Sequence, residues 1–296
     1  MQVSAGDTGD ASRLDPLLDR AAADGVGGLI VATDGPHDEP VQANRWPTVR
    51  GSVPALLVPG NWTGRLNAAI DGGRAELRFE ATTSPGQGWN VLGQLGPPDA
   101  PVVIVTTPLT GWFRCAGERG TGIAAALTLA QTLAADHRVE FVGCGGHELH
   151  FRGLEHHLEH RVVDRVVDRV VEGATVIQLG ASVGATVPTP TGPGQLDPGR
   201  MVLTTMTGEP RSAISELVAQ GNWTAADLGD RAWPGESGLW QRAGAEVLAF
   251  LGHSHHFHAA SDLPQLATSA DAMARATSIA IEASRHYVKS CLTSTS

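Results

Sequence analysis

Short apolar runs alternate with longer segments of helical period from residue 89 to the end of the chain. This alternation predicts an α/β fold with a doubly wound, mostly parallel sheet covered by helices on both faces. Residues 161–171 carry valine pairs every four residues, which is the apolar stripe of an amphipathic helix. Strands are expected near residues 90–95, 101–106, 138–144, 174–180, 201–206 and 246–251. Helices are expected near residues 120–135, 153–172, 211–220 and 268–289.

The chain divides near residue 88. Before that point, short apolar segments broken by Gly, Pro, Asp and Asn predict a small β-rich module within residues 25–81. Residues 81–88 have the Thr, Ser, Pro and Gly content of a linker. We therefore expect an N-terminal segment of residues 1–88 and a larger domain of residues 89–296. The apolar segments of the module are residues 26–32, 53–58 and 75–81, and its helix is expected near residues 63–69.

Composition and charge exclude several classes of protein. With 296 residues and 42% hydrophobic content, the chain can bury one large core and a small satellite domain. The net charge of −10 and the single lysine, Lys289, argue against nucleic acid and anionic membranes as partners. The N-terminus lacks the features of a signal peptide, and no run approaches the roughly 18 apolar residues of a membrane span. Three cysteines do not make a disulfide framework, so we expect a soluble, cytoplasmic protein.

Polar side chains gather after two of the expected strands. Glu118 and Arg119 follow the second strand, and His147 and Glu148 follow the third. Because loops at the carboxyl ends of strands bind ligands in open α/β sheets, we expect these groups to face one crevice. An imidazole can move a proton at neutral pH, so His147 is a candidate proton shuttle. Taken alone, Glu118 and Arg119 also fit a helix cap with a surface ion pair.

The same loops offer a second chemistry and a substrate pocket. Cys115 lies on the loop of Glu118 and would approach His147 if the two strand ends are neighbours. A thiolate beside an imidazole is an activated nucleophile, so this pair would form a metal-free site for acyl transfer or elimination. A buried apolar role is the alternative for the cysteine. Aromatic rings can line a pocket, and glycines let backbone approach a ligand closely. The candidate substrate contacts are Trp112, Phe113, Gly145 and Gly146.

The order of these segments resembles a known family. Residues 25–81 resemble a protease-associated domain, and residues 89–296 resemble the M28 family of zinc aminopeptidases, which also includes the glutaminyl cyclases. Residues 102–105 are similar to the family's strand before its His-x-Asp motif, and residues 141–148 to the strand that ends in its Glu-Glu pair. Residues 257–262, Phe-His-Ala-Ala-Ser-Asp, resemble the family's last zinc histidine with the Asp that follows it.

The resemblance implies that one of the family's two metal sites has lost its ligands. Thr107 stands where the family has the metal-binding His of His-x-Asp, and Leu109 stands where it has the Asp. Gly180 replaces a third ligand at the end of a later strand. Because none of these side chains ligates zinc, at most one zinc ion is expected per chain.

The second metal site of the family maps onto Glu118, Glu148 and His258. Two carboxylates and an imidazole are an acceptable set of three zinc ligands with an open fourth position. The family's catalytic base, the first Glu of its pair, is replaced here by His147. The resemblance therefore implies a zinc ion that polarises a carbonyl group and His147 as the proton shuttle. Arg119, next to Glu118, is a candidate to stabilise a developing oxyanion.

Three functions remain open from the sequence. The first is an M28-peptidase-like hydrolase, or a related enzyme, that acts on an amide or acyl bond of a small-molecule or peptide-like substrate. The second is a metal-free enzyme that uses Cys115 and His147. The third is a catalytically inactive scaffold that binds a peptide or partner through the module and the remaining crevice.

Overall fold

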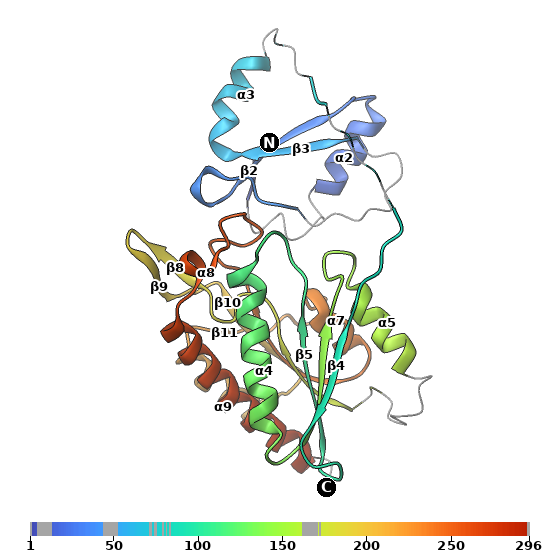
Figure 1. The fold of residues 1–296 in the computed structure, drawn as a ribbon, viewed down its shortest axis with the longest axis vertical. Coiled ribbons are helices and arrows are strands. Elements are labelled where there is room, and N and C mark those ends of the chain that lie inside the picture. The colour runs from blue at the N-terminus through green and yellow to red at the C-terminus, as the bar shows by residue number, and fades with distance from the viewer. Residues whose placement is uncertain are drawn as a thin grey trace.

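The structure has a small N-terminal module and a larger domain built on a seven-stranded sheet (Figure 1). The computed structural model describes residues 2–4, 14–43, 53–70, 84–161 and 173–294, together with residues 73, 76–78, 80, 82 and 171. Within these ranges, none of the helices is long and apolar enough to cross a membrane.

The module folds around a short parallel sheet. Its elements are β1 (Gln2–Ser4), α2 (Leu14–Ala23), β2 (Leu29–Asp34), η1 (Pro36–Asp38), β3 (Ala55–Pro59), η2 (Gly60–Trp62) and α3 (Thr63–Ile70). The strands pair in the order β1-β2-β3, and Val31 packs with Leu18 of α2 in a core of its own. The sequence predicted β2, β3 and α3 but neither β1 nor α2. Of the third predicted strand, residues 76–78 and 80 form no strand, and residues 75, 79 and 81 lie outside the described residues.

The larger domain is built on a mostly parallel sheet, which confirms the predicted fold class. Its strands are β4 (Val91–Leu95), β5 (Val102–Pro108), β6 (Arg138–Cys144), β7 (Thr175–Leu179), β10 (Arg200–Thr204), β11 (Thr224–Ala225) and β12 (Glu246–Gly252). They lie in the order β11-β10-β12-β7-β5-β6-β4. Only two pairs in this sheet, β10 with β12 and β4 with β6, are antiparallel.

Helices cover both faces of this sheet, because side chains that alternate along each strand are buried on opposite sides. Val103 and Val105 of β5 join one core cluster, while Ile104 joins the other. The first cluster contains side chains of α4 (Thr121–Leu133), α6 (Gly208–Ala219) and α9 (Ala270–Ser294). The second contains side chains of α5 (Arg152–Arg161) and α7 (Gly235–Arg242). Figure 1 shows α4 and α9 side by side over one face.

Two parts of this domain differ from the sequence prediction. The expected helix at residues 153–172 is seen as α5, and residues 162–170 and 172 lie outside the described residues. The sequence predicted neither α7 nor the hairpin between β7 and β10, because their segments are short and rich in Gly and Pro. That hairpin consists of β8 (Thr186–Thr189) and β9 (Gly192–Leu196), and it packs on α8 (Pro264–Ala267).

The module docks on the loop that follows β12. The backbone N–H of Gln42 donates to the carbonyl oxygen of His258 at 2.9 Å. The backbone N–H of Ser261 donates to Glu39 Oε2, also at 2.9 Å. In Figure 1 the module lies at the end of the sheet where α4 begins. The carboxyl ends of β5, β6 and β12 therefore face the module.

Candidate active site

Glu118 and Arg119 lie on one π-helical turn, η3 (Ala116–Gly120), between β5 and α4. Such turns are rare and occur frequently at functional sites. The carboxylate of Asp262 holds the turn, because it accepts hydrogen bonds from the N–H groups of Gly117 at 2.7 Å and Glu118 at 2.9 Å. Glu118 is 0% exposed and Arg119 is 2% exposed. A surface ion pair is therefore wrong for these two residues.

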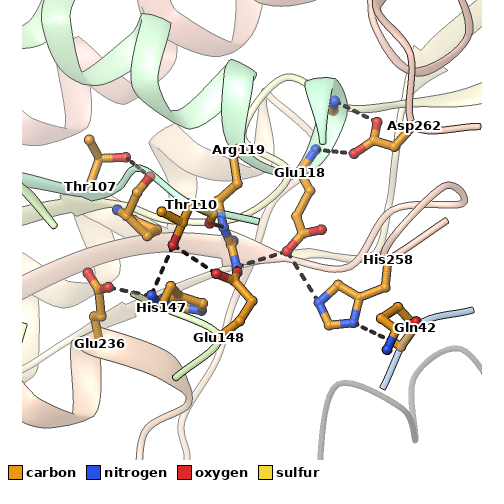
Figure 2. Close-up of polar contacts among 12 residues, drawn as sticks. Gln42, Thr107, Thr110, Glu118, Arg119, His147, Glu148, Glu236, His258 and Asp262 are labelled. Carbon is orange, nitrogen blue, oxygen red and sulfur yellow. Dashed lines mark hydrogen bonds and ion pairs between the residues drawn. The ribbon is translucent and has the colours of Figure 1, made fainter. Parts of the chain in front are cut away.

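The Arg119 guanidinium lies between two carboxylates (Figure 2). Its Nη2 is 2.8 Å from Glu118 Oε1 and 3.2 Å from Glu148 Oε1. Its Nε donates a hydrogen bond of 2.7 Å to the carbonyl oxygen of Thr110. Thr110 Oγ1 in turn donates to Glu148 Oε2 at 2.8 Å. The planar guanidinium thus joins the loop after β5 to the loop after β6.

His147 is paired with a residue that the sequence did not single out. Its Nδ1 is 3.0 Å from Oε1 of Glu236, which lies in the first turn of α7 (Figure 2). Its backbone N–H donates to Thr110 Oγ1 at 3.0 Å. Glu236 is fully buried, whereas 12% of the His147 side chain is exposed. Within the described part of the chain, the ring of His147 makes one hydrogen bond, through Nδ1.

His258 approaches Glu118 from the loop after β12. Its Nδ1 is 2.9 Å from the carbonyl oxygen of Gln42. A carbonyl oxygen only accepts, so Nδ1 carries the hydrogen of this contact. The other ring nitrogen, Nε2, is 3.3 Å from Glu118 Oε1. Among the described residues, this Nε2 and Glu118 Oε2 are buried and have no hydrogen-bond partner, and Glu118 Oε1 is in ion contact with Arg119.

Burial and charge give the ionisable groups different protonation states. Burial raises the pKa of Glu236 to about 8, and the charge of Glu148 adds to this rise. Burial also opposes ionisation of Glu118, but Arg119 and His258 outweigh it and hold the pKa of Glu118 at about 2. Burial, followed by the charge of Arg119, lowers the pKa of His147 well below its ordinary value. At neutral pH Glu118 is therefore ionised, Glu236 is protonated and His147 is neutral.

The residues that the resemblance implies as zinc ligands do not form an open metal site. Glu118, Glu148 and His258 lie together, but Nη2 of Arg119 occupies the space between the two carboxylates. No group of three His, Cys, Asp or Glu side chains could hold a metal ion in the part of the chain that the structure describes. A dication placed here would also face a buried positive charge. In this arrangement the residues do not fit zinc.

Cys115 lies beside the charged cluster, and none of the described residues acts as a base toward its thiol. It precedes η3 with a left-handed backbone, φ 36°. Burial, followed by the charge of Glu118, raises the pKa of its thiol to about 11. The described residues show no hydrogen bond between Cys115 and His147, whose Nδ1 is held by Glu236. A thiol that stays protonated at neutral pH does not favour the cysteine-nucleophile hypothesis.

A groove of about 1150 Å³ runs along the loop that carries His147, between β4 and α5. Two of the four candidate substrate contacts, Gly145 and Gly146, line it. Trp112 and Phe113 lie outside it, and Phe113 is exposed. The other residues that line the groove include Trp89, Asn90, Leu149, Arg152, His156 and His160. His147 is not among the lining residues, so the groove borders the site through Gly145 and Gly146, and it is large enough for a small ligand.

Sequence reasoning missed Glu236 and Thr110. Glu236 lies 89 residues from His147, and only the packing of α7 brings the two together. Its sequence signal is weak, because an acidic residue after Pro-Gly is common in the first turn of a helix. Thr110 lies within the loop whose other residues were considered, but a threonine in a loop has no distinctive pattern.

Comparison with solved structures identifies the fold. The chain is similar to a peptidase M28 precursor from Shewanella amazonensis, with a TM-score of 0.63, 16% identity, and coverage of 97% of this chain and 67% of that one. It is also similar to a zinc aminopeptidase from Bacillus subtilis, with a TM-score of 0.59 and 15% identity. That match covers 90% of this chain and 65% of the other. A third similar structure is an aminopeptidase from Aneurinibacillus sp. strain AM-1. Its TM-score is 0.52 and its identity 12%, and the match covers 96% of this chain and 67% of that one.

These similarities show the fold alone, because the identities are low. The chain has an M28-aminopeptidase-like fold, which confirms the resemblance stated from the sequence. It spans about two thirds of the length of these structures. No family model matches the chain, and no curated protein matches it.

Proposed function

We propose that the protein is a hydrolase of amide or acyl bonds in which His147 moves the proton. The observation that carries this proposal is the pair of His147 Nδ1 with the buried Glu236 at 3.0 Å. An imidazole with one nitrogen held by a carboxyl group and the other open has the geometry of a general base. The peptidase-like fold supports this class of reaction. The adjacent groove offers room for a small-molecule or peptide-like substrate, and we propose a cytoplasmic location.

The protonation of this pair sets the pH at which it acts. Glu236 Oε2 is buried without a partner among the described residues, so the carboxyl proton is best placed on Oε1, where it donates to His147 Nδ1. In that state Nε2 carries the imidazole hydrogen and is a donor. When Glu236 loses its proton near its pKa of about 8, Nδ1–H donates to the carboxylate and Nε2 can accept a proton from water. Activity should therefore increase with pH through about 8.

Arg119 supplies the positive charge of the proposed site. The resemblance implied one zinc ion on Glu118, Glu148 and His258, and that set does not fit the ion as it lies. We assign stabilisation of a developing oxyanion to Arg119, because a fixed cation in a water-poor site stabilises nearby negative charge strongly. Its guanidinium is 2% exposed and is held in place by three oxygen contacts.

A second candidate function is a peptidase-like scaffold that binds a peptide in the groove without cleaving it. The observation that favours it is the closed state of the charged cluster. The side chains of Glu118 and His258 are 0% exposed, and His258 is tied to the module through Gln42. Charged groups that satisfy one another in this way can serve only to hold loops together.

Variants of the pair test the proposal. Aminoacyl anilides and nitrophenyl esters are offered to the wild type, His147→Ala, Glu236→Gln and the control His286→Ala on α9, from pH 6 to 10. His147→Ala should reduce the rate by about 10²–10⁴ with an unchanged circular dichroism spectrum, because a general base contributes that much. The control should keep the wild-type rate. A folded His147→Ala variant that retains the wild-type rate would remove His147 from the mechanism, and a wild type that binds peptide without turnover would favour the scaffold.

A further inference from the structure

We infer that Arg119 is a built-in cation that takes the place of a divalent metal ion among Glu118, Glu148 and His258. Its Nη2 contacts Oε1 of both carboxylates, at 2.8 Å and 3.2 Å. Figure 2 shows the guanidinium end of Arg119 between these two side chains, with His258 on the far side of Glu118. The inference concerns cation binding and holds whether or not the protein is a hydrolase.

Glu118 and His258 keep the spacing of two ligands on one ion. Zinc bonds of about 2.0–2.1 Å at tetrahedral angles place neighbouring ligand atoms roughly 3.3 Å apart. The separation of Glu118 Oε1 and His258 Nε2 is 3.3 Å. Two acceptor atoms this close need a proton or a cation between them. The hydrogen bond from His258 Nδ1 to the Gln42 carbonyl oxygen directs Nε2 toward Glu118, as outer contacts of metal-binding histidines do.

Two buried atoms of this cluster, on the side chains of Glu118 and His258, lack a hydrogen-bond partner in the part of the chain that the structure describes. Among the described residues, Glu118 Oε2 and His258 Nε2 are buried without a hydrogen-bond partner, whereas Glu118 Oε1 is in ion contact with Arg119. Buried polar atoms are seldom left in this state, because each costs free energy unless it is paired. Arg119 contacts both carboxylates, and His258 faces Glu118 from the other side. The cluster therefore keeps the side chains of a cation-binding site. The cation in it is the guanidinium of Arg119, which is part of the chain.

The positive charge of Arg119 excludes a second cation. A unit charge about 4 Å away in a partly buried site lowers the affinity for a dication by roughly 10³-fold or more. Removal of the guanidinium should leave two carboxylates and an imidazole around an opening that a divalent cation can enter. Arg119 then acts as the residue that makes the cluster independent of metal.

Zinc titration of the full chain tests this inference. The wild type, Arg119→Ala and Arg119→Gln are dialysed against chelator and titrated with zinc by calorimetry and with cobalt(II) by visible absorption. Both variants should bind one equivalent with an affinity at least about 100-fold above any binding by the wild type, since the repelling charge is gone. Zinc should also raise the melting temperature of the variants and leave that of the wild type unchanged.

A matched control assigns the bound ion to this cluster. Arg119→Ala combined with Glu118→Gln loses one ligand and should bind no zinc, even though the histidines of residues 253–258 are intact. Arg119→Gln keeps a donor for the Thr110 carbonyl oxygen. If Arg119→Ala does not fold, zinc binding is judged from Arg119→Gln. The inference is overturned if the folded variants bind no zinc. It is equally overturned if the wild type binds zinc that is lost in Glu118→Gln.

Discussion

Replacement of Glu236 by glutamine should change how the stability of the protein depends on pH. Burial raises the pKa of this carboxyl group from 4.5 to about 8 in the folded state. The folded state therefore keeps a proton that the unfolded state releases. The stabilisation is fully present below pH 4.5 and is lost progressively as pH rises to about 8. Glutamine does not titrate, so its contribution to the free energy of unfolding does not change over the same pH range.

The size of the effect follows from the two pKa values. The interval from 4.5 to about 8 corresponds to about 5 kcal/mol of unfolding free energy at about 1.4 kcal/mol for each pH unit. Asp262, whose pKa burial raises to about 6, adds a loss of the same sign, and His147, whose pKa burial lowers, adds a gain; both occur in the wild type and in the variant. The comparison of the two proteins therefore isolates Glu236. Glu118, with a pKa of about 2, changes the free energy of unfolding only at more acidic pH.

Urea unfolding at pH 5 and pH 9, followed by circular dichroism, measures this difference. The wild type should lose several kcal/mol more than Glu236→Gln between the two pH values. The amide keeps both the volume and a hydrogen bond to His147 Nδ1, so packing changes little. Equal losses in the two proteins would refute the reasoning, because they would show that Glu236 is ionised in the folded state at neutral pH.

Two further variants test other parts of the site. Cys115→Ser should keep most of any activity, and iodoacetamide should react slowly with Cys115 at pH 7.5, because the pKa of the thiol is about 11. Rapid inactivation by iodoacetamide that substrate prevents would instead support the cysteine-nucleophile hypothesis. Asp262→Ala removes the acceptor of two buried N–H groups of η3 and should lower the free energy of unfolding by about 2–4 kcal/mol. The matched control Asp271→Ala, at an exposed position in the first turn of α9, should change it by less than about 0.5 kcal/mol. Equal effects of the two aspartates would show that Asp262 does not hold the π-helical turn.

The sequence by itself determined the architecture of the larger domain and much of the location of its site. Apolar runs such as Val102–Pro108 are buried on both faces and need helices on either side, so the order of strands and helices predicts the doubly wound sheet. Polar residues at strand ends meet at one edge of such a sheet. For this reason Glu118 and Glu148 could be grouped before the structure was known, and the family resemblance added His258 to them.

Only the tertiary structure decided the chemistry of that site. The partner of His147 comes from α7, 89 residues away, and no local pattern encodes a contact between the loop after β6 and a helix so distant in the chain. The π-helical turn directs the Arg119 side chain inward to lie between two carboxylates, although its sequence also fits a surface cap. Spacing along the chain gives the types of group that can meet. The direction of each side chain, and therefore which cation fills the space between carboxylates, is set by packing.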